Sequence, residues 1–156
     1  MNRPHLLMGA LMSPLLVGGL LMGAPGDAQA APAPQISLHV EAGPQSVRSP
    51  YYPFAVILDG NYAGRVVWSR DPGGDLNNDG ATDPGDSAIA HDQTADGWGI
   101  EARLPNGAVS TTRGMDSPVY GKWASHLGAE GTGTKLTGCV VRGSERYCDA
   151  AQAVYR

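Results

Sequence analysis

An acidic segment is the part of this 156-residue sequence most suited to chemistry. Between residues 71 and 96 there are seven aspartates and neither lysine nor arginine. The remainder of residues 31–156 holds ten basic against seven acidic residues, so charge is segregated within the molecule. Because crowded carboxylates repel one another, the segment favours a bound cation that would neutralise it.

Oxygen-bearing side chains follow a defined spacing within residues 75–86. Counting from Asp75, they occupy positions 1, 3, 5, 9 and 12, and Gly80 occupies position 6. This spacing resembles the EF-hand calcium loop, in which D-x-[DN]-x-[DN]-G is followed by five residues and a glutamate. The resemblance implies calcium ligation by side-chain oxygens, by one backbone carbonyl at position 7, and at position 9 directly or through water. The residues so assigned are Asp75, Asn77, Asp79, Ala81, Asp83 and Asp86.

The segment departs from the EF-hand pattern at its end and at its flanks. Position 12 is Asp86 rather than glutamate, as in dockerin-type loops, and Thr82 replaces an aliphatic residue at position 8. Neither flank has a helical pattern, so we expect a stand-alone calcium loop that joins two strands. All the ligands are hard oxygens, which favours calcium, whereas magnesium keeps more waters. The alternative is a solvated polar turn, in which Asp, Asn and Gly are common.

A second polar cluster lies at residues 92–99. One interpretation is a tight loop between strands, and another is that Asp92 or Asp96 adds a calcium ligand or orients the calcium loop. Together with Gly85-Asp86, the segment 111–114 and the terminal cysteines, this stretch is similar to small secreted β-sandwich proteins of filamentous actinobacteria. The similarity covers residues 85–150 and implies a fold and a compartment, but no activity.

The N-terminal region has the pattern of a secretory signal peptide. Arg3 precedes an apolar stretch from Leu6 to Met22, and Ala28-Gln29-Ala30 supplies small residues for cleavage. We therefore predict a signal peptide at residues 1–30, a flexible leader at 31–35 and a single domain at 36–156. The expected location is extracellular, with no membrane association after cleavage.

Composition and periodicity predict an all-β fold. The 22 glycines and 12 prolines disfavour a helix bundle, and apolar residues alternate at Ile36, Leu38 and Val40. Asn106-Gly107 is typical of a type I′ turn. We expect an antiparallel β-sandwich, immunoglobulin-like or fibronectin-like, of seven to eight short strands. The expected strands are 36–41, 54–58, 65–69, 87–91, 99–104, 108–113, 135–142 and 147–155.

The two cysteines are expected to form a disulfide across the last hairpin. If Gly143-Ser144 is a two-residue loop, Arg142 faces Glu145, and counting outward Cys139 faces Cys148. This is a non-hydrogen-bonded pair, at which the Cα atoms are close enough for a disulfide. Export would supply the oxidising compartment.

Three tryptophans are candidates for a binding surface. Trp68, Trp98 and Trp123 could present an aromatic platform to a sugar ring or a protein partner, because such residues are enriched at contact surfaces. The alternative is that they fill the interior of the sandwich.

The sequence contains no recognised catalytic motif. Neither H-E-x-x-H nor G-x-S-x-G occurs, and the remaining catalytic hypothesis is a triad of His91 and Asp92 with any serine of the chain. The net charge of −4 gives no basic footprint for nucleic acid. We therefore expect a secreted, non-catalytic, calcium-stabilised module that binds an extracellular protein or glycan. The alternatives are a small secreted hydrolase and an inhibitor of secreted enzymes that inserts residues 114–121 into its target.

Overall fold

Alternating apolar side chains organise the chain into strands. The computed structural model describes residues 31–41, 49–126 and 133–154, and over these ranges it has eleven β-strands and no helix. The described part therefore contains no helix able to cross a bilayer. The expected signal peptide lies outside the described residues.

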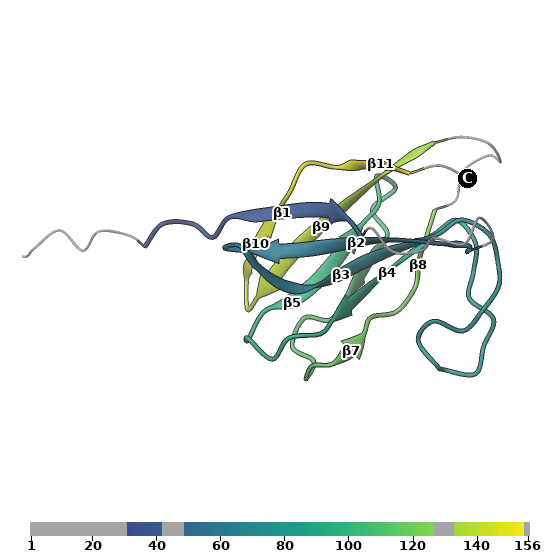
Figure 1. Cartoon of the computed structure of the whole chain (residues 1–156), viewed down its shortest axis with the longest axis horizontal. Coiled ribbons are helices and arrows are strands. Elements are labelled where there is room, and N and C mark those ends of the chain that lie inside the picture. Colours follow the sequence, from purple (N-terminus) through teal and green to yellow (C-terminus); the bar gives the residue numbers. More distant parts are fainter. Residues whose placement is uncertain (1–30, 42–48, 127–132, 155–156) are drawn as a thin grey trace, which may run out of the picture. The chain divides into compact units, whose positions relative to one another are not determined.

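Two antiparallel sheets pack face to face and confirm the predicted β-sandwich (Figure 1). The first sheet has the order β1-β2-β3-β4-β7, with β8 also paired to β4. Its strands are β1 (Ile36–Val40), β2 (Tyr51–Leu58), β3 (Asn61–Ser69), β4 (Ser87–Asp92), β7 (Val119–Tyr120) and β8 (Ala124–Ser125). The second sheet has the order β10-β9-β5-β6, with β11 paired to β9. Its strands are β5 (Gly99–Arg103), β6 (Val109–Thr111), β9 (Thr134–Arg142), β10 (Glu145–Cys148) and β11 (Gln152–Val154).

The strand count exceeds the seven to eight that we expected. The unpredicted strands are β7 and β8, each of two residues, which pair with the edge of β4. The expected strand 147–155 is replaced by β10 and β11, both paired to β9. Two-residue strands have no periodicity that a sequence pattern could reveal.

The inward faces of the two sheets form one hydrophobic core. Val56 and Val66 from the first sheet lie in it with Ile100 and Val140 from the second. A fully buried apolar side chain of this size contributes about 1.5–3 kcal/mol. Trp68 belongs to the same core with 0% of its surface exposed, so our inclusion of Trp68 in a binding surface was wrong.

Strand β1 has one buried residue, which lies at its middle. Leu38 is buried, whereas Val40 is 64% exposed, so the apolar face that we expected does not continue to the end of β1. Leu38 packs so closely on β9 that a Cβ placed on Gly138 would lie 2.6 Å from its Cδ2 atom. Glycine at this position lets the two sheets approach each other.

The type I′ turn occurs at a different position from the one that we predicted. Asp59 and Gly60, which join β2 to β3, both have positive φ, at 49° and 81°. At the expected site only Gly107 does, at 87°, and its N–H donates to the Leu104 carbonyl at 3.0 Å. Pro105 fixes φ near −65°, which suits the first central position of a type I turn. The proline therefore decides the turn type.

The predicted register of the last hairpin is confirmed. Arg142 pairs with Glu145, and Cys139 pairs with Cys148. The two cysteines form a disulfide with their Cα atoms 4.0 Å apart. The bond ties the edge strand β10 to β9.

Removing this disulfide should lower stability without changing the fold. Because the closed loop is short, Cys139→Ala/Cys148→Ala should reduce the free energy of unfolding by about 2–3 kcal/mol, measured by urea denaturation. Dithiothreitol should destabilise the wild type by a similar amount and leave the variant unaffected. Equal stability of wild type and variant would contradict this role.

Candidate functional site

Residues 70–86 form a long loop between β3 and β4, which we call the acidic loop (Figure 1). Backbone hydrogen bonds close its base. The Gly73 N–H donates to the Asp83 carbonyl and the Asp83 N–H donates to the Gly74 carbonyl, both at 3.1 Å. The Asp86 N–H donates to the Arg70 carbonyl at 3.3 Å. The two ends of the loop are thus fixed to each other as well as to the sheet.

Asp83 anchors the acidic loop to the sandwich. Its side chain is only 2% exposed, and its Oδ2 atom accepts hydrogen bonds from the Tyr51 hydroxyl at 2.5 Å and the Leu76 N–H at 2.6 Å. The Tyr51 oxygen also lies 2.6 Å from the Gly73 carbonyl. Burial, followed by the interaction with Asp83, raises the pKa of Tyr51 well above its ordinary value. The hydroxyl therefore remains a proton donor to the loop.

The close approach of Tyr51 explains one glycine of the acidic loop. Gly74 has a φ of 79°, and a Cβ placed on it would lie 2.2 Å from the Tyr51 hydroxyl. A side chain at residue 74 would displace the tyrosine from Asp83. Gly74 is thus required by both conformation and space.

The tip of the acidic loop is organised around two carboxylates. Asp75 accepts from the N–H groups of Asp79 at 2.9 Å and Gly80 at 3.0 Å. Asp79 accepts from the Ala81 N–H and from Asn77 Nδ2, each at 2.8 Å, and these contacts lower its pKa. The Asn77 Oδ1 atom is shielded from solvent and has no hydrogen-bond donor among the described residues. The tip therefore offers one unsatisfied oxygen, on Asn77, in the same short segment as two exposed aspartates.

The six predicted calcium ligands do not all come together. Asp75, Asn77 and Asp79 are linked at the tip, whereas the Asp83 carboxylate is directed to Tyr51 at the base. Asp86 begins the return to β4 with a φ of 51°, and its carbonyl accepts from the His126 N–H at 2.7 Å. Within the described ranges, no three or more His, Cys, Asp or Glu side chains are arranged to hold a metal ion. The donor chemistry at the tip fits calcium, whereas Asp83 serves the fold.

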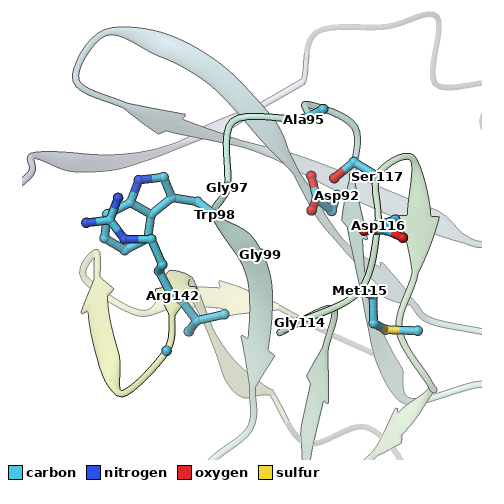
Figure 2. Close-up of a pocket in the computed structure, with 12 residues that line it drawn as sticks. Asp92, Ala95, Gly97, Trp98, Gly99, Gly114, Met115, Asp116, Ser117 and Arg142 are labelled. Carbon is cyan, nitrogen blue, oxygen red and sulfur yellow. The ribbon is translucent and has the colours of Figure 1, made fainter.

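A cavity of about 270 Å³ lies beside the β4–β5 loop. Figure 2 shows Trp98 and Arg142 together on one side of it, and Asp92, Asp116 and Ser117 together on the other. The Arg142 guanidinium lies over the Trp98 ring, 4.1 Å from its centre. Glycines 97, 99, 114 and 143 also line the cavity, so backbone groups are accessible in it.

Asp92 is the most perturbed group of this cavity. Its carboxylate is buried, and it accepts hydrogen bonds from the Thr94 N–H at 3.1 Å and from the Ser117 hydroxyl. Burial raises the pKa of Asp92 above its ordinary value, although both hydrogen bonds act in the opposite direction. Perturbed carboxyl groups in cavities are frequent at functional sites. The residue pattern singled out 92–99 but not this cavity, because Ser117 is distant from Asp92 in the chain.

Neither Asp92, the last residue of β4, nor Asp96 in the β4–β5 loop reaches the acidic loop. Asp86 directly precedes β4, whereas Asp92 is its last residue. The six residues of an extended strand separate its two ends by about 17 Å. Asp96 accepts from the Trp98 N–H at 2.8 Å and shapes the turn. The hypothesis that Asp92 or Asp96 completes the calcium loop was therefore wrong.

His91 does not form a triad with Asp92. Successive strand residues face opposite sides of a sheet, and the His91 ring stacks on Tyr120 with the centroids 3.7 Å apart. Its Nδ1 atom accepts from Arg65 Nε at 3.1 Å. Burial and the neighbouring Arg65 charge lower the pKa of His91 to about 4. The ring is thus neutral and points away from the cavity.

The remaining tryptophans are half-buried. Trp98 lines the cavity and meets Tyr147 edge to face, with the centroids 5.8 Å apart. Trp123 lies elsewhere, and its Nε1 atom is shielded and has no hydrogen-bond acceptor among the described residues. Residues 114–116, part of the segment expected to insert into a target enzyme, are exposed at the rim of the cavity.

Comparison with protein-family models, with curated protein sequences and with solved structures finds no match for this chain. The resemblances to EF-hand loops and to secreted actinobacterial proteins stay predictions. A functional assignment therefore depends on the chemistry of the acidic loop and the cavity.

Tyr51→Phe should loosen the acidic loop. The substitution removes one of the two donors to a buried carboxylate, so the free energy of unfolding should fall by about 1–3 kcal/mol in urea denaturation. Tyr52→Phe is the matched control, since the Tyr52 hydroxyl accepts from Arg70 at 3.0 Å and, among the described residues, does not donate to Asp83. If both variants lost the same stability, Asp83 would not depend on Tyr51.

Asp92→Asn should stabilise the protein at neutral pH. Because the folded-state pKa of Asp92 is raised, the folded protein loses stability as the pH rises through that value and the buried carboxyl ionises. Asparagine keeps an acceptor for Thr94 but cannot ionise. Urea denaturation at pH 3 and pH 7 should show the gain at pH 7 only.

The exposed Asp116 provides the control for this comparison. Asp116→Asn lies at the same cavity and should leave the free energy of unfolding within about 0.5 kcal/mol of the wild type. If the Asp92→Asn variant were less stable than the wild type at pH 7, the claim that the buried, ionised Asp92 carboxylate lowers the stability of the protein would be wrong.

Proposed function

We propose that the protein is a secreted, non-catalytic binding module whose acidic loop is stabilised by calcium. The observation that carries the calcium part is the Asn77 Oδ1 atom, which is shielded and has no donor among the described residues, in an amide that itself donates to Asp79. A calcium ion would take these hard oxygens as ligands together with the Ala81 carbonyl and reduce the repulsion among the carboxylates. Asp83 is not needed as a ligand in this proposal.

The cavity beside the β4–β5 loop is the proposed binding site. It combines the half-buried Trp98 with the polar groups of Asp92, Asp116 and Ser117, and the backbone of three lining glycines lies between the two groups. Sites for small ligands combine an apolar surface with a few polar groups in this way. At about 270 Å³ the cavity has room for one sugar-sized group rather than a long segment. This supports a glycan as the ligand.

Calcium should raise the thermal stability of the wild type. At a hundredfold excess over its dissociation constant, a ligand stabilises by about 2.7 kcal/mol, which shifts the midpoint of a domain of this size by about 4–8 °C. Thermal unfolding in EGTA and in millimolar calcium measures this shift. Magnesium should have little effect, because it keeps more of its own waters.

Substitutions in the acidic loop locate the ion. Asp75→Ala and Asp79→Ala should each abolish the calcium response while the strands stay folded. Asp71→Ala is the matched control, since Asp71 is exposed outside the EF-hand-like spacing and pairs with Arg70 at 2.6 Å. A calcium response that survives both loop substitutions would overturn this site.

A small secreted hydrolase is the second candidate function. The buried Asp92, with a raised pKa and a neighbouring Ser117 hydroxyl, is the observation that favours it. Hydrolysis of a glycoside or ester by the wild type, lost in the folded Asp92→Asn variant, would favour this candidate. Ligand binding without turnover would favour the module.

A further inference from the structure

Three arginines converge on one glutamate on the outer face of the second sheet. Glu101 Oε2 lies 2.9 Å from Arg103 Nη1 and 2.7 Å from Arg146 Nε, and Glu101 Oε1 lies 3.6 Å from Arg113 Nη2. The arginines come from β5, from the segment after β6 and from β10. We call these four residues the arginine face.

Both carboxylate oxygens of Glu101 are paired with arginines of the arginine face. It is 3% exposed, and although its burial acts to raise its pKa, the bonds and charges of Arg103 and Arg146 outweigh burial and lower it. The carboxylate is therefore ionised at neutral pH. One negative charge stands against three positive charges, so the face keeps an excess of two.

The arginines retain unused hydrogen-bonding capacity. The side chains of Arg103 and Arg146 are 34% and 43% exposed. Arg103 donates to Glu101 through Nη1 and Arg146 donates through Nε, and a guanidinium carries five N–H donors, so each side chain can serve a second acceptor. Because Glu101 already holds these side chains in place, an incoming anion would not have to order them.

The arginine face adjoins the cavity. Arg113 Nη1 donates to the Gly143 carbonyl, and Gly143 lines the cavity. The cavity presents the carboxylates of Asp92 and Asp116, which accept hydroxyl donors and repel anions. A ligand that extends from the cavity to the arginine face thus meets hydrogen-bond acceptors first and cations next.

We propose that the arginine face binds carboxylate groups of an acidic oligosaccharide whose hydroxyl groups occupy the cavity. Guanidinium groups suit carboxylates because they can donate two parallel hydrogen bonds. A nucleic acid is disfavoured, because the net charge of −4 repels a long polyanion, whereas a short acidic oligosaccharide carries only a few charges. The inference rests on the binding part of the proposed function and not on calcium.

Isothermal titration with a uronic-acid tetrasaccharide and its neutral methyl ester tests the proposal. The wild type should prefer the acid, and the preference should weaken as salt is raised. Arg103→Gln/Arg146→Gln should reduce affinity for the acid roughly tenfold per arginine and leave affinity for the ester unchanged. The titrations are run in EGTA and repeated with calcium, so that failure of the calcium proposal is seen separately.

Two further variants keep this test decisive. Arg70→Gln removes the arginine of the acidic loop, outside the arginine face, and should bind both ligands like the wild type. If the double variant unfolds because Glu101 is left with Arg113 alone, Glu101→Gln/Arg103→Gln/Arg146→Gln removes the buried charge together with its partners.

Four results would overturn the inference. They are equal affinity for the acid and the ester, no binding of the acid, unchanged binding by the arginine variants, and a preference of the wild type for an acidic peptide over the acid sugar. Binding of the ester without preference for the acid would refute the arginine face alone. Failure to bind either sugar would refute the glycan site as well.

Discussion

The hydrogen bonds that the Asp83 carboxylate accepts hold the acidic loop to the sandwich. Tyr51 donates from β2 and Leu76 donates from within the loop, so one buried carboxylate links the sheet to both arms of a long connection. An unpaired buried carboxylate would be costly, and these two donors compensate for its desolvation. The anchor leaves Asp75 and Asp79 exposed at the tip. Arg70 is the one basic residue of the acidic loop, so residues 71–86 contain no lysine or arginine to offset the repulsion between these carboxylates. Calcium is proposed at the one part of the connection that the fold does not neutralise itself.

Much of the architecture is local in origin and could be predicted from the sequence. The register from Arg142–Glu145 to Cys139–Cys148 follows from one two-residue loop, since each pair fixes the next. Strands β1 and β5 follow from the alternation of apolar and polar residues, and β2 follows from a continuous apolar run. Trp68 could not be placed, because Arg65 to Ser69 is mostly apolar and such a run does not reveal which face is inward.

The candidate sites depend on contacts that are distant in the chain. The twelve-residue spacing revealed the acidic loop, but not that Asp83 turns to Tyr51, which lies 32 residues away. Glu101 alternates with the core residues Ile100 and Ala102, which indicates an outward-facing side chain, yet arginines from three segments cover it. Asp92 and Ser117 meet only because the segment before β7 returns to β4. Buried charges at such places reduce stability unless they are paired.

The most direct test of the account is a calcium titration followed by amide NMR of the protein. Calcium held by Asp75, Asn77 and Asp79 should shift the amide resonances of Asp79, Gly80 and Ala81, because these N–H groups donate to the same carboxylates. Resonances around Asp92 and Glu101 should change little. Absence of shifts in the loop, or shifts confined to the cavity, would contradict calcium stabilisation of the acidic loop.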